Sequence, residues 1–111
     1  MSKYRNKKVN IDGIWFDSIR EARRYGELKL LQRGGYIKDL KLQVPFELLP
    51  NQKNADGKVI ERKVRYIADF TYHDNVKDED VVEDAKGCRT EVYRLKKKLL
   101  LDRYGIQIKE V

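Results

Sequence analysis

Apolar and polar residues alternate over residues 9–16 (Val-Asn-Ile-Asp-Gly-Ile-Trp-Phe), and the alternation is centred on Asp12-Gly13. An Asp-Gly pair between two apolar runs is typical of a two-residue hairpin turn. The pattern therefore predicts a short β-hairpin near the start of the chain. We expect Trp15, on its second strand, to pack on the body of the domain.

A helical pattern follows the hairpin. Ser18 with Glu21 three positions later is typical of a helix N-terminus, where the hydroxyl accepts a backbone N–H and the glutamate can close a capping box. The next apolar residues recur every three or four positions and Gly34-Gly35 can end the helix, so we predict a helix over residues 18–33. Its buried stripe is expected to contain Ile19, Ala22, Tyr25, Leu28 and Leu31.

Three extended segments are predicted in the middle of the chain. Residues 37–44 carry regularly placed apolar side chains, and Pro45 indicates an edge strand or a bend, because proline cannot donate to a sheet ladder. Residues 50–57 are polar and predict a loop. Residues 64–72 are rich in β-branched and aromatic side chains and give the clearest strand, while residues 81–86 predict a third and shorter one.

A second helix and a last strand complete the pattern. Thr90 can cap a helix that runs to about Tyr104, where Gly105 can supply a left-handed terminator. Residues 106–111 alternate apolar and polar positions, as a half-buried strand does. The buried side of this second helix is expected to consist of Val92, Leu95, Leu99 and Leu100.

Length and element order together indicate one domain of the α/β class. A chain of 111 residues is long enough for one hydrophobic core but not for two independent ones. We expect a basic segment and hairpin over residues 1–17 and a core over residues 18–111. The order helix, three strands, helix, strand predicts a mixed sheet flanked by helices.

The charge balance indicates an acidic partner. The formal net charge is +7 and the sequence pI is about 9.5. Nucleic acid is favoured over a membrane because no long apolar run or basic amphipathic anchor is present, although a merely soluble basic protein has the same balance. Cys88 is the only cysteine, which excludes an internal disulfide and a cysteine-based zinc site and fits a reducing cytoplasm.

Two carboxylates and an ammonium group are expected to converge where neighbouring strands end. Residues two apart on a strand share a face, so Asp84 and Lys86 should point the same way, and Asp69 should join them from an adjacent strand. With the carbonyl of Ala85, these oxygens can hold Mg²⁺ or Mn²⁺, with Lys86 beside a metal-bound water. An ordinary salt-bridged trio at a sheet edge is the alternative interpretation.

The start of the second helix comes directly after this cluster. Because helix N-termini attract phosphate, Arg89, Thr90 and Tyr93 are candidate contacts to a nucleic acid, as are Lys96 and Lys97 on the face predicted to be exposed. A run of lysines on a helix can equally be a solvated face.

These features resemble the PD-(D/E)XK nuclease superfamily, which includes restriction enzymes, phage exonucleases and Holliday-junction resolvases. The similarity covers nearly the whole chain and is nearer still to a small phage and prophage family within that superfamily. It rests on the order of elements and on four segments: Phe16-Asp17-Ser18-Ile19-Arg20-Glu21-Ala22, Tyr66-Ile67-Ala68-Asp69-Phe70, Val82-Glu83-Asp84-Ala85-Lys86-Gly87 and Tyr93-Arg94-Leu95-Lys96-Lys97-Lys98.

The resemblance implies a restriction-endonuclease-like αβββαβ core and assigns roles to individual residues. Asp69 would be the metal-binding aspartate, Asp84 the second acid and Lys86 the lysine of the motif. Glu21 would be directed at the metal as a further ligand and catalytic residue, whereas on sequence alone a capping role explains it more simply. The chain departs from the motif's name at Ala68, where that name has proline.

The implied activity is Mg²⁺-dependent endonucleolytic cleavage of DNA. The substrate would be double-stranded or branched DNA in phage recombination, repair or processing, in the cytoplasm of a bacterial host. Resolution of a four-way junction needs two active sites, which a homodimer supplies. A non-catalytic basic DNA-binding accessory protein with a structural acidic cluster is the alternative, and a nuclease that acts on RNA is a third.

Overall fold

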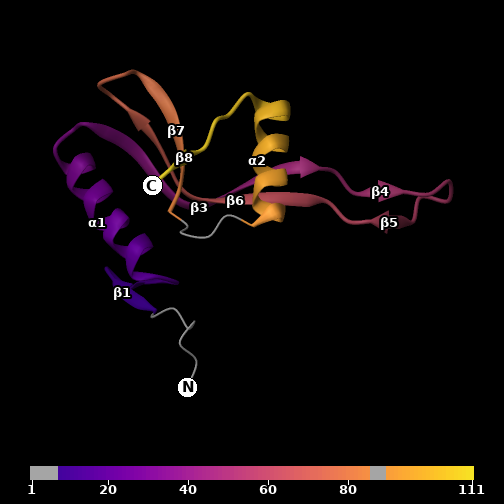
Figure 1. The fold of residues 1–111 in the computed structure, drawn as a ribbon, viewed down its shortest axis with the longest axis horizontal. Coiled ribbons are helices and arrows are strands. Elements are labelled where there is room, and N and C mark those ends of the chain that lie inside the picture. Colours follow the sequence, from indigo (N-terminus) through magenta and orange to yellow (C-terminus); the bar gives the residue numbers. More distant parts are fainter. Residues whose placement is uncertain (1–7, 86–89) are drawn as a thin grey trace.

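The computed structural model describes residues 8–85 and 90–111, which form a four-stranded mixed sheet, two helices and two smaller hairpin sheets (Figure 1). The order helix, three strands, helix, strand is present, with two further short strands inserted after the first of the three. In chain order the elements are β1 (Val9–Ile11), β2 (Ile14–Phe16), α1 (Ile19–Arg33), β3 (Ile37–Leu49), β4 (Gln52–Lys53), β5 (Val59–Glu61), β6 (Val64–Asp74), β7 (Glu79–Asp84), α2 (Glu91–Tyr104) and β8 (Lys109–Glu110).

The main sheet has the strand order β3-β6-β7-β8. Strands β3, β6 and β7 are antiparallel to their neighbours, whereas β8 is parallel to β7. A parallel pair requires a crossover, and α2 supplies it between β7 and β8. Pro45 lies in β3, at the edge of the sheet, where a missing N–H is tolerated as predicted.

The N-terminal hairpin has the predicted turn but presents a different aromatic side chain to the core. Asp12 and Gly13 have φ values of 56° and 79°, which are the positive values that a tight hairpin turn requires. Trp15 is 69% exposed, so its predicted packing is wrong. Phe16, the next residue, points to the opposite face of the strand and packs on Tyr25, with ring centroids 5.0 Å apart.

Helix α1 begins as the sequence predicts. The Ser18 hydroxyl accepts the N–H of Glu21 at 3.1 Å, and Gly35, with φ 81°, follows the C-terminal end. Ala22, Tyr25 and Leu28 are buried. Ile19 and Leu31 are exposed, so the buried stripe is narrower than predicted.

Helix α2 is capped as predicted but rotated relative to the predicted face. Thr90 accepts the N–H of Tyr93, and Gly105 adopts the left-handed conformation at the other end. Its buried residues are Tyr93 and Leu100, whereas Val92 and Leu95 are exposed. Among the described residues, neither helix is long and apolar enough to cross a membrane.

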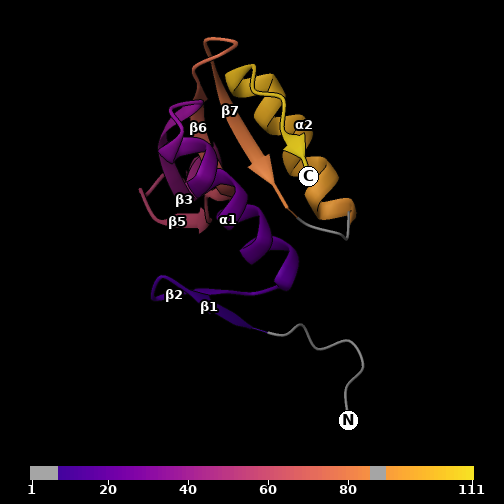
Figure 2. The same ribbon diagram turned by 90° about the vertical axis from the view of Figure 1, so that its left-hand side faces the viewer.

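The sheet has two separate cores, and β6 passes from one to the other. Tyr66 and Ala68 pack in a cluster with residues of α2, whereas Phe70 and Tyr72 pack in a cluster with residues of α1. Side chains two apart on a strand share a face, and these four buried side chains divide between the two clusters along the length of β6. Figure 2 shows α1 and α2 on different sides of β7.

The backbone of β3 has an unusual conformation at the position opposite Asp69. Leu42 pairs with Phe70 and Val44 with Ala68, so Gln43 lies opposite Asp69. Gln43 has φ 52°, an unusual value for a residue with a side chain. Asp69 therefore lies at the boundary between the two cores.

Beyond the second core, the β3–β6 ribbon continues as a protruding arm (Figure 1). Strands β4 and β5 pair with each other in the stretch after Leu49, so the prediction of a plain loop over residues 50–57 is wrong. The radius of gyration is 16.6 Å, compared with about 13 Å for a compact domain of this length. The extra extent reflects the arm and the N-terminal hairpin.

Candidate metal and nucleic-acid site

Asp69 and Asp84 lie opposite each other on β6 and β7. The antiparallel ladder pairs Phe70 with Glu83, and one further step in that register puts Asp69 beside Asp84. Both aspartates are buried, with 3% and 1% of their surface exposed. The structure thus brings together the two carboxylates that the sequence predicted to converge.

Neighbouring groups hold both carboxylates in place. The Ala85 N–H donates to Oδ2 of Asp69 at 2.8 Å, and the Tyr66 hydroxyl donates to Oδ2 of Asp84 at 2.7 Å. Burial, followed by the hydrogen bond to Asp84, raises the pKa of Tyr66 well above its usual range, so this hydroxyl stays protonated as a donor. The charge of Asp69 also contributes to this shift, which places both acids near the same phenol.

Gln43 contributes a third contact from the strained position on β3. Its Nε2 lies 3.5 Å from Oδ1 of Asp69, at the outer limit for a hydrogen bond. Unusual backbone conformations cost free energy and often occur at functional sites. Gln43 thus combines a left-handed φ with a side-chain amide directed at Asp69.

Glu110, which the sequence analysis did not single out, lies next to Asp84 on β8. The parallel ladder pairs the two residues. Glu110 accepts the hydroxyl of Tyr93 at 2.7 Å and the ammonium of Lys97 at 3.3 Å. The alternation that places Ile108 inward also places Glu110 inward. This alternation over residues 106–111 was the sequence feature from which the position of Glu110 could have been predicted.

Three of the predicted nucleic-acid contacts on α2 are buried, half-buried or paired within the protein. Tyr93 is a core residue with 8% exposure, Lys97 is paired with Glu110 and Lys96 is half-buried. Thr90 is exposed at the start of the helix, and its side chain caps that helix. Of the other predicted site residues, Glu21 is half-buried in the first turn of α1 and Ala85 is buried. Lys86 and Arg89 lie outside the described residues.

Within residues 8–85 and 90–111, no three His, Cys, Asp or Glu side chains are grouped so that they could hold a metal ion. Glu21 lies in the first turn of α1, and Asp69 and Asp84 lie on β6 and β7. The oxygen donors at the end of β7 are the two carboxylates and the backbone carbonyl of Ala85.

A protein-family model described as "Protein of unknown function (DUF1064)" matches residues 1–110. The chain belongs to this family. No curated protein and no solved structure matches it. The match spans both helices and every strand that the structure describes, so the acid pair lies within the matched residues.

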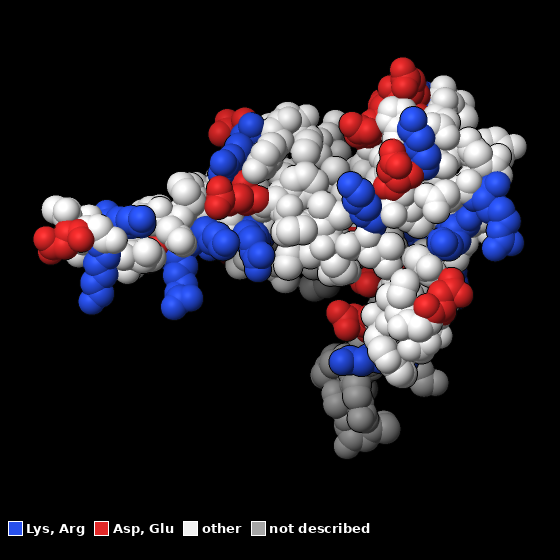
Figure 3. All heavy atoms as spheres, turned by 180° about the vertical axis from the view of Figure 1, so that it is seen from behind, with Lys and Arg blue, Asp and Glu red and all other residues white. Residues whose placement is uncertain are grey.

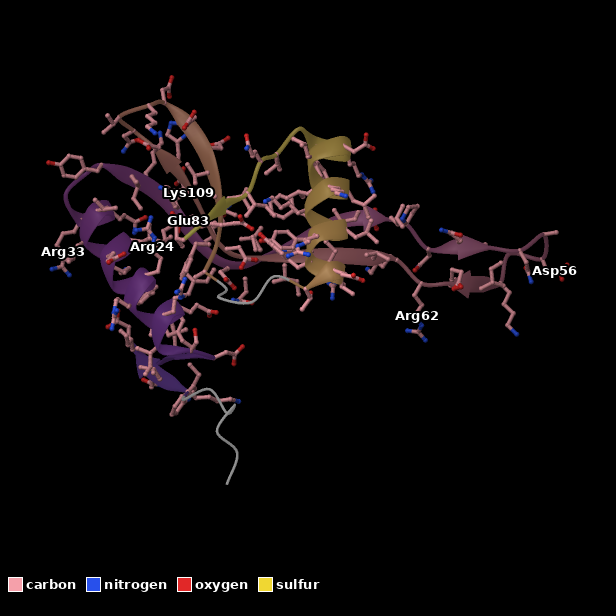
Figure 4. All side chains as sticks on the ribbon, in the orientation of Figure 1. Arg24, Arg33, Asp56, Arg62, Glu83 and Lys109 are labelled. Carbon is pink, nitrogen blue, oxygen red and sulfur yellow. The ribbon has the colours of Figure 1, made fainter. Side chains whose placement is uncertain are left out.

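A buried ion pair fixes α1 of this DUF1064 protein to the strand that carries Asp84. Arg24 donates from Nε and Nη2 to the two carboxylate oxygens of Glu83, at 2.8 and 2.6 Å, and Figure 4 shows the two side chains pointing toward each other. The hydroxyl of Tyr72 also donates to Glu83. Burial, followed by the hydrogen bond to Glu83, raises the pKa of Tyr72 above its usual range. Glu83 thus has a structural role next to the acid pair.

The DUF1064 chain also has an open hollow of about 880 Å³ over β6, β7 and the segment before β8. Positively and negatively charged side chains line it, including Lys41, Asp74 and Lys109. None of the predicted site residues that the structure describes lines this hollow. The acid pair is therefore separate from it.

His73, at one rim of this hollow, is expected to titrate above the usual range of histidine. Its ring nitrogens lie 2.9 Å from Asp80 and 3.0 Å from Asp78, and the hydrogen bond to Asp80, then that to Asp78, raises the pKa. A raised folded-state pKa stabilises the fold below the unfolded value of about 6.5. That contribution is lost as pH rises through the folded-state pKa.

An NMR titration of this single histidine measures the shift directly. Asp80→Asn should lower the pKa of His73 toward about 6.5. Glu79→Gln, an exposed change on the same strand, should leave it unchanged. Equal titration curves for the wild type and Asp80→Asn would contradict the expected pairing.

Proposed function

We propose that this member of the DUF1064 family is a Mg²⁺- or Mn²⁺-dependent endonuclease that cleaves DNA. The observation that carries the proposal is the pair of buried carboxylates, Asp69 and Asp84, placed opposite each other where the β6–β7 ladder ends. Like charges so close repel, and a shared cation offsets that repulsion. Carboxylate oxygens, together with the carbonyl of Ala85, are the donors that Mg²⁺ and Mn²⁺ prefer.

The side chains around the pair fit such a role. When bound, the metal ion would polarise a phosphodiester and lower the pKa of a water ligand. Tyr66 and the Ala85 N–H hold the carboxylates in fixed orientations. Lys86, two positions after Asp84, would add positive charge close to the scissile phosphate, and the N-terminus of α2 begins shortly afterwards at Thr90.

The resemblance to the PD-(D/E)XK superfamily supports the same reaction. Its motif positions correspond to Asp69, Asp84 and Lys86, and the net charge of +7 suits a polyanionic substrate. Double-stranded or branched DNA in phage recombination or repair, acted on by a homodimer in a bacterial cytoplasm, is part of this proposal. Glu21 would belong to the site as a further metal ligand, as the resemblance implies, with a role in capping α1 as the alternative.

A second function, a non-catalytic DNA-binding module, is favoured by the burial of the acids. Asp69 and Asp84 are almost fully covered and already accept hydrogen bonds from protein groups. A carboxylate that acts only in the structure would have the same environment. This module would bind DNA in a salt-sensitive way without cleaving it.

A plasmid assay separates the two functions. Supercoiled DNA is incubated with the full chain in Mg²⁺, in Mn²⁺ and in chelator, and binding is followed by fluorescence anisotropy in chelator alone. Nicking that requires the metal supports the nuclease. Salt-dependent binding without nicking in either metal, together with no Mn²⁺ binding in calorimetry, would leave the binding module.

A further inference from the structure

We propose that the β4–β5 arm, residues 50–65, is a duplex-binding ribbon that enters a groove of B-form DNA. The inference rests on the proposed function only in taking DNA as the substrate. It concerns a surface that lies outside the acid pair and whose first part, residues 50–57, was predicted to be a loop. Its support comes from shape, charge, exposed apolar residues and internal order.

The shape of the arm is that of a probe rather than of a packing element. Every residue from 49 to 63 is exposed, and neither hydrophobic cluster includes a residue of β4 or β5. The whole molecule measures 53 × 46 × 25 Å, and Figure 1 shows the arm projecting along the longest direction. A ribbon that buries nothing in its own domain is suited to burying its surface in a partner.

The charge of the arm suits a polyanion. It carries five basic residues and only two acids, Asp56 and Glu61. None of the five forms an ion pair within the part of the chain that the structure describes. Figure 3 shows Lys and Arg side chains projecting along the arm, and Figure 4 shows Arg62 pointing away from the ribbon. The five are Lys53, Lys58, Arg62, Lys63 and Arg65.

Two aliphatic side chains lie among these cations. Ile60 is 60% exposed and Val59 is partly exposed on β5. Together with Arg62, Lys63 and Arg65 they line a shallow depression on the arm. Cations reach phosphates while aliphatic groups contact sugars and thymine methyl groups, so this mixture is typical of a surface that lies in a DNA groove.

The arm is ordered by its own hydrogen bonds. At the tip, Oδ1 of Asn54 accepts the N–H groups of Asp56 and Lys58, and Gly57 has φ 83°. At the base, Oδ1 of Asn51 accepts the N–H of Lys63 at 2.7 Å. A ribbon that is already ordered loses less conformational entropy on binding than a flexible loop would.

The width and length of the two-stranded arm favour B-form DNA over other nucleic acids. The B-DNA major groove, about 12 Å wide, admits a two-stranded ribbon, whereas the major groove of an RNA duplex is too narrow. Along β5 and β6 the chain from Asp69 to the tip at Asp56 spans up to about 40 Å. One turn of duplex is about 34 Å. The arm can therefore hold DNA about one turn away from the acid pair.

The test compares two triple variants of the full chain with equal loss of charge. The arm variant is Lys53→Ala, Arg62→Ala and Lys63→Ala. The control is Arg23→Ala, Arg33→Ala and Lys38→Ala, three exposed cations of α1 and the start of β3, and Figure 4 shows Arg33 at the opposite end of the molecule from Arg62. Binding to a 30-base-pair DNA duplex is measured in chelator by anisotropy, over a range of salt concentrations.

We expect the arm variant to bind roughly a hundredfold more weakly at 0.1 M salt and to lower the slope of log K against log salt by about 3. The control should lower the slope by less than 1. The wild type should prefer the DNA duplex to an RNA duplex of the same sequence, and the arm variant should lose that preference. Unfolding temperatures of all three proteins should agree, because the six substituted side chains are exposed and lie outside both hydrophobic clusters.

Three outcomes would overturn the inference. The first is an arm variant whose slope of log K against log salt equals that of the wild type. The second is an equal fall in that slope for the arm variant and the control. The third is a wild type that is a dimer and an arm variant that is a monomer with unchanged affinity for DNA. The last outcome would assign the arm to a second copy of the chain. Because binding is measured without metal, the result is independent of cleavage. Either proposal, DNA binding by the arm or metal-dependent cleavage, can therefore be contradicted while the other holds.

Discussion

Asp84→Asn is expected to abolish metal-dependent cleavage of DNA while leaving the fold and the DNA affinity near those of the wild type. The change removes one negative charge from the acid pair but keeps an oxygen that can accept the Tyr66 hydroxyl. Loss of groups that merely support metal ligands lowers activity by about 10- to 100-fold, so loss of a ligand charge should lower it at least about 100-fold. The rate of plasmid nicking in Mg²⁺ measures the effect.

Asp102→Asn is the matched control, because Asp102 is an exposed aspartate on α2 outside the acid pair. It should nick DNA at the wild-type rate. Calorimetry with Mn²⁺ gives a second readout, in which Asp84→Asn should lose heat of binding and Asp102→Asn should keep it. Full nicking activity in Asp84→Asn would remove the acid pair from the reaction.

The largest loss of stability is expected for Arg24→Ala. This change leaves the fully buried carboxylate of Glu83 without the guanidinium that donates two hydrogen bonds to it. Breaking a buried ion pair from one side costs about 3–5 kcal/mol. For a domain of this size the unfolding temperature should fall by at least about 10 °C.

Arg23→Ala is the control for that measurement, since Arg23 is the exposed neighbour of Arg24 on the same helix. Its free energy of unfolding in urea should change by less than about 0.5 kcal/mol. Arg24→Lys should fall between the two, because lysine keeps the charge but not the paired N–H groups. A loss below 1 kcal/mol for Arg24→Ala would show that the pair adds little to the docking of α1.

Local signals in the sequence were enough for most of the elements. Asp12-Gly13 marks the hairpin turn, Ser18 and Thr90 cap the two helices, and Gly105 ends the second. Each of these depends on backbone geometry within a few residues, which the side chain itself determines. The same is true of the two aspartates, whose positions follow from strand alternation and pairing.

The errors concern contacts between distant residues. The buried face of α2 was misplaced because Tyr93 finds a partner in Glu110, and no local pattern shows that a phenol will outrank Val92 or Leu95 for the core. Glu83 finds Arg24 across 59 positions of sequence. The left-handed φ of Gln43, opposite Asp69, is a further feature that its side chain type did not indicate.

The passage of β6 between two cores has a consequence for how the proposed nuclease activity would be lost. Asp69 sits where one cluster ends and the other begins, so its distance from Asp84 depends on both helices remaining docked. Detachment of a single helix is a partial opening, which requires less free energy than global unfolding. Inactivation by mild denaturant should therefore precede the loss of backbone amide protection in much of the sheet.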